Sequence, residues 1–325
     1  MSVNHLARLL ESGEYRRCLD EASALLQQGG QSAEAVTRIQ AAICRSSLEL
    51  SDYFAAVDAG RAAVAMAAEA GSPDLLGPAL LDLATAHSQI RQYSEAVAVF
   101  EQFLEGLATY TAARCLEGTA LQRLAETLAS AGDPAEALAR LCEARIWFER
   151  YGDAASAMEC ARAAMHVHLE QGELAEALPY LQAGARYAAA RHGDREFRTN
   201  HLLDRALLYL ATGQPEAAGA AAFAALEAAE GNLMAQSRAQ LMLAHSALAQ
   251  NKPHEAFSFA LAARISAIDG RAYDIEFDAS DILFRLLRER GERLLREVEA
   301  DFYQQGVDIH HYLSRRVVAR MTRAN

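Results

Sequence analysis

The sequence predicts an all-α protein, a solenoid of about eight antiparallel helix pairs with a C-terminal capping helix. Three observations lead to this fold class. A short motif of the form "GELAEAL" recurs eight times, at steps of 38 to 41 residues. The segments between the copies carry apolar residues at helical spacing, and no alternating strand pattern lies among them. Hydrophobic residues make up 52% of the chain, mostly Ala and Leu, which favour closely packed helices.

Each copy of the motif is expected to form the turn between the two helices of a pair. We mark a copy by the residue expected in the first turn of its second helix: Tyr15, Tyr53, Tyr93, Pro134, Leu174, Pro215, Pro253 and, in a degenerate copy, Arg293. Gly132 suits the left-handed backbone at the end of a helix. Asp133 is expected to cap the next helix, with Glu136 completing a capping box.

A small residue follows most markers by three positions, where it allows the two helices to cross closely. These residues are Ala56, Ala96, Ala137, Ala177, Ala218 and Ala256. Helical spacing also predicts two apolar faces, which hold Leu80, Leu83, Ala84 and His87 in one helix and Leu138, Leu141, Cys142 and Ile146 in another. Only the next pair can cover such a face, so the pairs should stack in chain order.

These residues resemble the tetratricopeptide repeat family over nearly the whole chain. The third repeat matches its pattern at Leu80, Leu83, Ala84, Tyr93, Ala96 and Phe100, and the fourth at Leu121, Leu124, Ala125, Gly132, Asp133 and Ala137. The early Trp and closing Pro of the family are missing, and the period is near 40 rather than 34 residues. The resemblance implies a right-handed superhelix. Repeats of this length are similar to those of bacterial peptide-sensing regulators and of adaptor proteins.

The resemblance also implies that the first helix of each pair lines a concave groove that binds a protein or peptide. The groove positions then fall on Arg38, Arg45, Gln89, Gln122, Glu126, Glu159, Arg162, His166, Asn200, Leu203, Arg238, His245 and Arg285. Arginines there could receive carboxylates of the ligand. Alternatively, these charges pair along their own helices on a solvated face, as the spacing of Glu159 and Arg162 allows.

Other classes of function find little support in the sequence. A net charge of −12 argues against direct binding of nucleic acid, and no apolar run is long enough to cross a membrane. No catalytic motif, cofactor motif or metal-binding spacing is present, since His166 and His168 are two residues apart and point to different helix faces. The five cysteines are expected to be buried free thiols in the cytoplasm.

We therefore expect residues 1–305 to form the repeat array and residues 306–325 to form a basic amphipathic capping helix. Ile309, Leu313, Val317 and Met321 share one face of that segment, which could alternatively bind a partner or a membrane surface. The predicted function is a cytoplasmic, non-enzymatic scaffold or adaptor that binds proteins or peptides. A stand-alone peptide- or ligand-sensing regulator is the first alternative. Such regulators usually carry an N-terminal effector domain, which is not expected where the repeats begin almost at Met1. A self-assembling structural scaffold, and hence a homo-oligomer, is the second.

Overall fold

A computed structural model of the chain describes residues 3–190, 193–270 and 272–304. Within these residues every regular element is helical, with fifteen α-helices, one 3₁₀ helix and no strand. The all-α prediction is therefore confirmed. Backbone contacts divide the chain into two compact units, Met1–Ala190 and Arg191–Asn325. We describe each unit by itself. The predicted capping segment, residues 306–325, lies outside the described residues.

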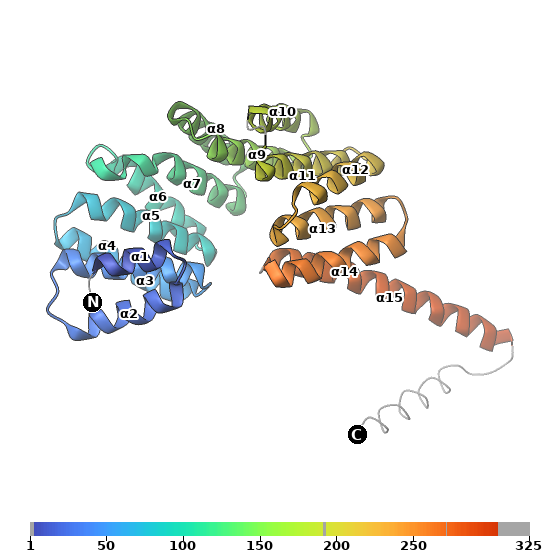
Figure 1. The fold of residues 1–325 in the computed structure, drawn as a ribbon, viewed down its shortest axis with the longest axis horizontal. Coiled ribbons are helices and arrows are strands. Elements are labelled where there is room, and N and C mark those ends of the chain that lie inside the picture. Colours follow the sequence, from blue (N-terminus) through green and yellow to red (C-terminus); the bar gives the residue numbers. More distant parts are fainter. Residues whose placement is uncertain (1–2, 191–192, 271, 305–325) are drawn as a thin grey trace, which may run out of the picture. The chain divides into compact units, whose positions relative to one another are not determined.

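Unit 1 is a row of antiparallel helix pairs that follow one another in chain order (Figure 1). Its helices are α1 (Val3–Glu11), α2 (Tyr15–Gln28), α3 (Ala33–Glu49), α4 (Tyr53–Glu69), α5 (Pro73–Gln89), α6 (Tyr93–Gly106), η1 (Thr111–Leu116), α7 (Glu117–Ala131), α8 (Pro134–Tyr151), α9 (Ala154–Glu170) and α10 (Leu174–Ala190). Each helix packs on the next one in sequence, as expected when each pair covers the apolar face of its neighbour.

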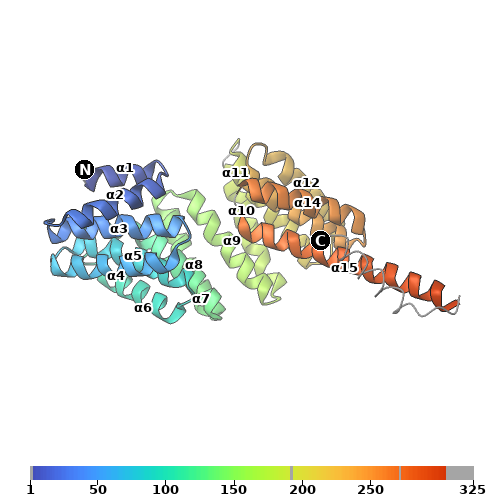
Figure 2. The ribbon, with the colours of Figure 1, turned by 90° about the horizontal axis from the view of Figure 1, so that it is seen from below.

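Unit 2 has the same construction. Its helices are α11 (Arg195–Ala211), α12 (Pro215–Ala228), α13 (Leu233–Ala249), α14 (Pro253–Gly270) and α15 (Tyr273–Gln304). Consecutive helices again pack on one another, and α11 contacts α13 as α13 contacts α15. Figures 1 and 2 both show the C-terminal half of α15 running on beyond α14.

The turn inside each pair is the most regular feature of the chain. The first seven marker residues are the first residues of α2, α4, α6, α8, α10, α12 and α14. Two residues before each marker the backbone has a positive φ, at Gly13, Ser51, Arg91, Gly132, Gly172, Gly213 and Asn251. Each of the seven turns thus contains one residue with left-handed backbone, and in three of the turns that residue is not glycine.

Small residues lie where the helices of a pair cross. The six alanines that follow the markers by three positions are all completely buried, as predicted.

Asp133 caps α8 by accepting a hydrogen bond from the amide of Glu136 at 3.2 Å. Glu136 does not complete the predicted capping box. Its carboxylate instead pairs with Arg140 one turn further along the helix, at 2.7 Å.

The predicted eighth turn is not formed. Helix α15 runs without a break from Tyr273 to Gln304 and so passes straight through Arg293. Neither Pro nor an Asp, Ser or Asn cap follows Gly291, and its neighbours Arg290 and Glu292 are good helix formers. One glycine costs a helix only about 1 kcal/mol, which these neighbours outweigh. The described chain therefore has seven complete pairs and one long final helix.

Two predictions of burial are wrong. On α8, Leu141 is buried, but Cys142 is exposed and Ile146 is 47% exposed, because periodicity cannot show how much of an apolar stripe the neighbouring helices cover. Cys18, Cys44 and Cys160 are buried free thiols, and burial raises the pKa of Cys44 and of Cys160 to about 12. Cys115, in the 3₁₀ helix, is exposed like Cys142.

The link between α6 and α7 departs from the other connections. Tyr110 fills it, stacked on Phe103 with their ring centroids 6.0 Å apart. A Cβ atom on Gly106 would collide with the Tyr110 ring, and one on Gly77 would lie 3.1 Å from it. These two glycines therefore make room for the ring, and the inserted 3₁₀ helix follows it along the chain.

Candidate functional site

The first helices of the pairs form a continuous layer in unit 1. Helix α3 contacts α5, α5 contacts α7 and α7 contacts α9, whereas no two even-numbered helices of this unit come into contact within its described residues. Elements on the inner side of a curved stack are closer together than those on the outer side. The odd-numbered helices are thus the inner layer of unit 1.

A row of charged side chains crosses three helices of this layer. Arg45 on α3 donates from Nε to Oδ2 of Asp82 on α5, at 2.7 Å, while Arg123 on α7 acts on Asp82 through its charge. Burial raises the pKa of Asp82, and the charge and hydrogen bond of Arg45 oppose that rise. The side chain of Asp82 is only 15% exposed, so the Arg45–Asp82 pair ties neighbouring pairs together.

We call the surface around this row the first-helix face of unit 1. It comprises Arg38, Arg45, Asp82, Gln89, Gln122, Arg123, Glu126, Glu159, Arg162 and His166. Asp82 and Arg123 were not among the sequence-predicted residues, although Arg123 directly follows the predicted groove residue Gln122. The others were predicted there, and all of them are exposed or half-buried.

Several groups on this face are paired within their own helices. Gln122 donates to Glu126 at 3.2 Å, and Arg162 pairs with Glu159. Arg38 and Arg123 are both exposed, and neither has a hydrogen-bonded acidic partner among the described residues. These two exposed guanidinium groups can therefore still receive hydrogen-bond acceptors, although the charge of Arg123 also acts on Asp82.

The predicted groove residues of unit 2 lie in more varied environments. Asn200 and Arg238 are half-buried, and Arg285 pairs with Asp281 of its own helix at 2.6 Å. Burial lowers the pKa of His245; the nearby charge of Asp278 raises it and that of Arg285 lowers it. Leu203 corrects the prediction: it is only 9% exposed and belongs to the core, because it packs with Ala225 and Ala239 of the next two helices.

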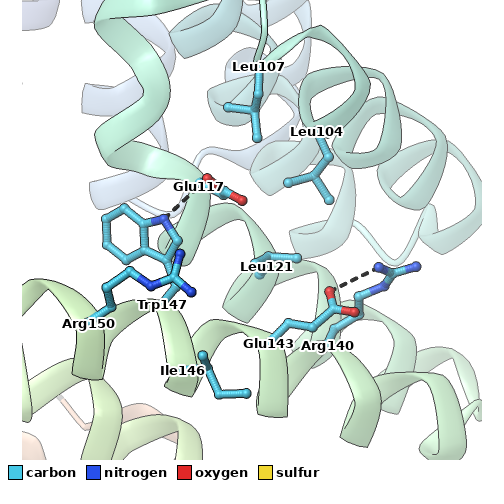
Figure 3. A pocket seen from close by; sticks show the side chains of 9 residues that line it. All are labelled: Leu104, Leu107, Glu117, Leu121, Arg140, Glu143, Ile146, Trp147 and Arg150. Carbon is cyan, nitrogen blue, oxygen red and sulfur yellow. Dashed lines mark hydrogen bonds and ion pairs between the residues drawn. The ribbon is translucent and has the colours of Figure 1, made fainter.

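Unit 1 also contains a cleft that the sequence did not predict. It has a volume of about 390 Å³ and is lined by Leu104, Leu107, Glu117, Leu121, Arg140, Glu143, Ile146, Trp147 and Arg150 (Figure 3). The cleft lies over α7, between the C-terminal end of α6 and the exposed side of α8. Its one sequence signal is Trp147, the only tryptophan of the chain.

The walls of this cleft combine apolar and charged groups. Trp147 donates from Nε1 to Glu117 at 3.2 Å, and its ring lies where a Cβ atom on Gly118 would collide with it. Arg140 is held by Glu143 at 3.1 Å, across the cleft from the indole (Figure 3). The arrangement can accept an apolar side chain, and the charges of Arg140 and Glu143 on its wall are paired with each other.

The two histidines near the end of α9, His166 and His168, have different surroundings. His166 is exposed, whereas His168 is buried and hydrogen-bonds from Nδ1 to Glu173 at 2.8 Å, across the turn that precedes α10. His87 makes the equivalent bond to Gln92 at 2.6 Å before α6. Among the described residues there is no group of three His, Cys, Asp or Glu side chains that could hold a metal ion. In the same residues, none of the helices is both apolar and long enough for a membrane span.

Comparison with known proteins identifies the fold. No protein-family model matches the chain, and no curated protein sequence matches it. Many solved structures are similar. A tetratricopeptide repeat protein from Parabacteroides merdae has a TM-score of 0.62 at 11% identity, with 88% of this chain and 97% of that chain covered. The protein thus has the fold of tetratricopeptide-like repeat proteins.

Two further solved structures are similar over most of their length. The apo form of RapI has a TM-score of 0.60 at 13% identity, covering 94% of this chain and 91% of that one. The Rap conjugation gene regulator of plasmid pLS20, in complex with the Phr* peptide, has a TM-score of 0.57 at 13% identity, covering 98% and 94%. At such identities the likeness concerns the fold alone.

Proposed function

We propose that this protein is a non-enzymatic peptide- or protein-binding module that holds its ligand along the first-helix face of unit 1. The observation that carries the proposal is the charged row on that face. Arg45 and Asp82 form an ion pair with each other. Arg38, two turns before Arg45 on α3, and Arg123 on α7 have no hydrogen-bonded acidic partner among the described residues. A surface with two exposed guanidinium groups that form no hydrogen-bonded ion pair suits a ligand that brings carboxylates.

The chemistry of arginine supports an acidic ligand. A guanidinium group binds a carboxylate through two parallel hydrogen bonds, which fixes both the position and the direction of the bound chain. The protein as a whole carries a net charge of −12, so most of its surface repels such a ligand. The local cations of the first-helix face would direct an acidic segment to this surface.

The fold supports a peptide ligand in particular. The pLS20 regulator, which is similar over 98% of this chain, is described in complex with a peptide. A cytoplasmic regulator that senses a peptide is therefore the specific form of the proposed function that we favour over a passive scaffold.

The test is to select binders and then remove the cations. The protein is used to select from a display library of random peptides of about a dozen residues, and the best binder is measured by fluorescence anisotropy. The double variant Arg38→Glu/Arg123→Glu should weaken binding at least about 30-fold, the loss expected for two central contacts. The matched control is Arg61→Glu/Arg186→Glu on the outer helices α4 and α10, which makes the same charge change at exposed sites.

The proposal holds if selected peptides are rich in acidic residues and only the first double variant loses them. It fails if the selection yields no binder, or if both double variants lose affinity equally. Equal loss would mean that net charge, rather than the first-helix face, governs binding.

A further inference from the structure

The last two described helices expose six large apolar side chains. On α14 these are Leu261, Ile265 and Ile268, which are 40%, 55% and 47% exposed. On α15 they are Phe277, Phe284 and Leu287, which are 74%, 65% and 56% exposed. We call these six residues the end face. The two helices pack on each other, and no described residue covers the end face.

Helix α14 differs from its counterparts at these positions. Leu261 and Ile265 lie eight and twelve residues after the start of the helix, on its exposed side. The equivalent pairs are Arg61 and Ala65 in α4, Glu101 and Glu105 in α6, and Gln182 and Arg186 in α10, all of them exposed. Only α8, which lines the cleft, also has two apolar residues at these positions, Cys142 and Ile146. Water faces this side of most second helices, so its apolar character in α14 indicates a partner.

Helix α15 differs from the other first helices at Phe284. This position normally packs against the second helix of the same pair. The equivalents of Phe284 are Cys44, Ala84, Ala125, Met165, Ala206 and Ala244, and all of them are buried. Most are small because the helices of a pair cross closely. A phenylalanine there cannot be covered at the same distance. Helix α15 is therefore not built to receive a second helix as the seven complete pairs do.

The predicted capping segment is too short to cover the whole end face as a helix. Residues 306–325 would span about 30 Å in helical form. Running back along α15 from Gln304, a helix must extend about 40 Å to reach Phe277. Phe277 would therefore remain uncovered by that stretch.

The charges along α15 suit pairing with an identical surface. Between Asp281 and Glu292 the helix carries three arginines and three acidic residues, namely Arg285, Arg288, Arg290, Asp281, Glu289 and Glu292. This stretch is neutral within a chain of net charge −12, so two copies can approach here without the repulsion that opposes contact elsewhere. Arg285 pairs with Asp281 and Arg288 with Glu292 inside the helix, so these charges are already balanced within one copy.

We propose that the end face is the interface of a homodimer, in which α14 and α15 pair with the same helices of a second copy about a two-fold axis. Such an interface is isologous, so one apolar surface covers its own equivalent and the array is closed at that end. The proposal concerns the outer surface of the last helices and is independent of ligand binding on the first-helix face of unit 1.

Sedimentation equilibrium and light scattering of the full chain, over about 1–100 μM, test this proposal. The wild type should be a dimer, and Phe277→Glu/Phe284→Glu should raise the dissociation constant more than about 30-fold, as expected for central aromatic contacts. The control is Phe54→Glu/Phe223→Glu, which changes two phenylalanines that are 74% and 52% exposed elsewhere. The control should leave the constant within about three-fold of wild type.

Two further variants separate the possible occupants. Phe277→Leu/Phe284→Leu keeps the apolar surface and should remain dimeric, with circular dichroism as the check on folding. A chain that stops at Gln304 should also remain dimeric. A monomeric wild type at every concentration, equal weakening by both glutamate pairs, or loss of the dimer when residues 305–325 are removed would overturn the proposal.

Discussion

Helices α5 and α15 occupy the same place in their repeats, yet they meet their surroundings in opposite ways. In α5 the crossing position holds Ala84, which is completely buried. In α15 it holds Phe284, which is 65% exposed. The turn after α5 has a left-handed residue and a new helix at Tyr93, whereas α15 continues past Gly291.

The comparison shows that the repeat is defined by two features that occur together. A small residue permits the close crossing, and a left-handed residue followed by a capped start returns the chain for that crossing. Helix α15 has lost both features while keeping the buried face that packs on α14, formed by Ile275, Ala279 and Ile282. One side of α15 therefore packs on the repeat array through α14. The opposite side, which in other repeats packs against the second helix of the pair, is left exposed.

Exchanging the residues at the crossing position should produce the largest difference between the two helices. Ala84→Phe forces a large side chain into a filled crossing and should lower the free energy of unfolding by about 3 kcal/mol. Phe284→Ala removes an exposed ring and should change it by less than about 0.5 kcal/mol. Urea unfolding of both variants, at a protein concentration below the dissociation constant of the proposed dimer, makes the comparison. Similar losses in the two variants would contradict it.

The turns allow a smaller, reciprocal test. Arg91 adopts a positive φ of 60°, a conformation that strains any residue with a Cβ atom. Arg91→Gly should therefore stabilise the protein by about 0.5–1 kcal/mol, after the extra freedom of glycine in the unfolded chain is subtracted. Gly132→Arg should destabilise it by about 1 kcal/mol. Thermal unfolding reports both changes.

A control for these turn variants is Arg61→Gly inside α4. Glycine in a helix interior should destabilise the protein by up to about 1 kcal/mol, the opposite sign to Arg91→Gly. If Arg91→Gly destabilises to the same extent, the left-handed residue is not under strain and the account of the turn is wrong.

The smallest expected effect concerns His245 on α13, which senses the charges of Asp278 and Arg285 on α15. Burial lowers its pKa in the folded protein, so the unfolded chain, with a histidine pKa of about 6.5, binds a proton more readily. The contribution is fully present above about pH 6.5 and is lost as the pH falls through the lowered pKa. His245→Gln should reduce the loss of stability between pH 7 and 5 by less than about 1 kcal/mol, measured by urea unfolding at each pH. An unchanged pH dependence would contradict the burial of the imidazole.

Local sequence signals predicted the fold because each turn is a local event. Gly132, Asp133 and Pro134 specify a helix end and a helix start within three residues, and the equivalent markers place the other six turns. The eighth turn was expected from spacing alone. It failed because the residues around Gly291 favour a helix, and no cap or proline competes with them.

The candidate site was less accessible to sequence reasoning because it depends on contacts between pairs. Positions in the repeat placed Arg38 and Arg45 on the first-helix face, but only packing shows that Asp82 and Arg123 complete the charged row. Packing likewise decides that Leu203 is core and that Ile146 is exposed. Periodicity gives the direction of a side chain from its own helix, and a neighbouring helix decides whether it is covered.

Hydrogen exchange followed by mass spectrometry, at protein concentrations well above and well below the dissociation constant of the dimer, tests the difference between α5 and α15 most directly. The account predicts that the amides of α14 and α15 exchange more slowly at the higher concentration, while those of α5 and α6 exchange at the same rate in both samples. Equal exchange of α15 in the two samples, or concentration-dependent protection of α5, would contradict it.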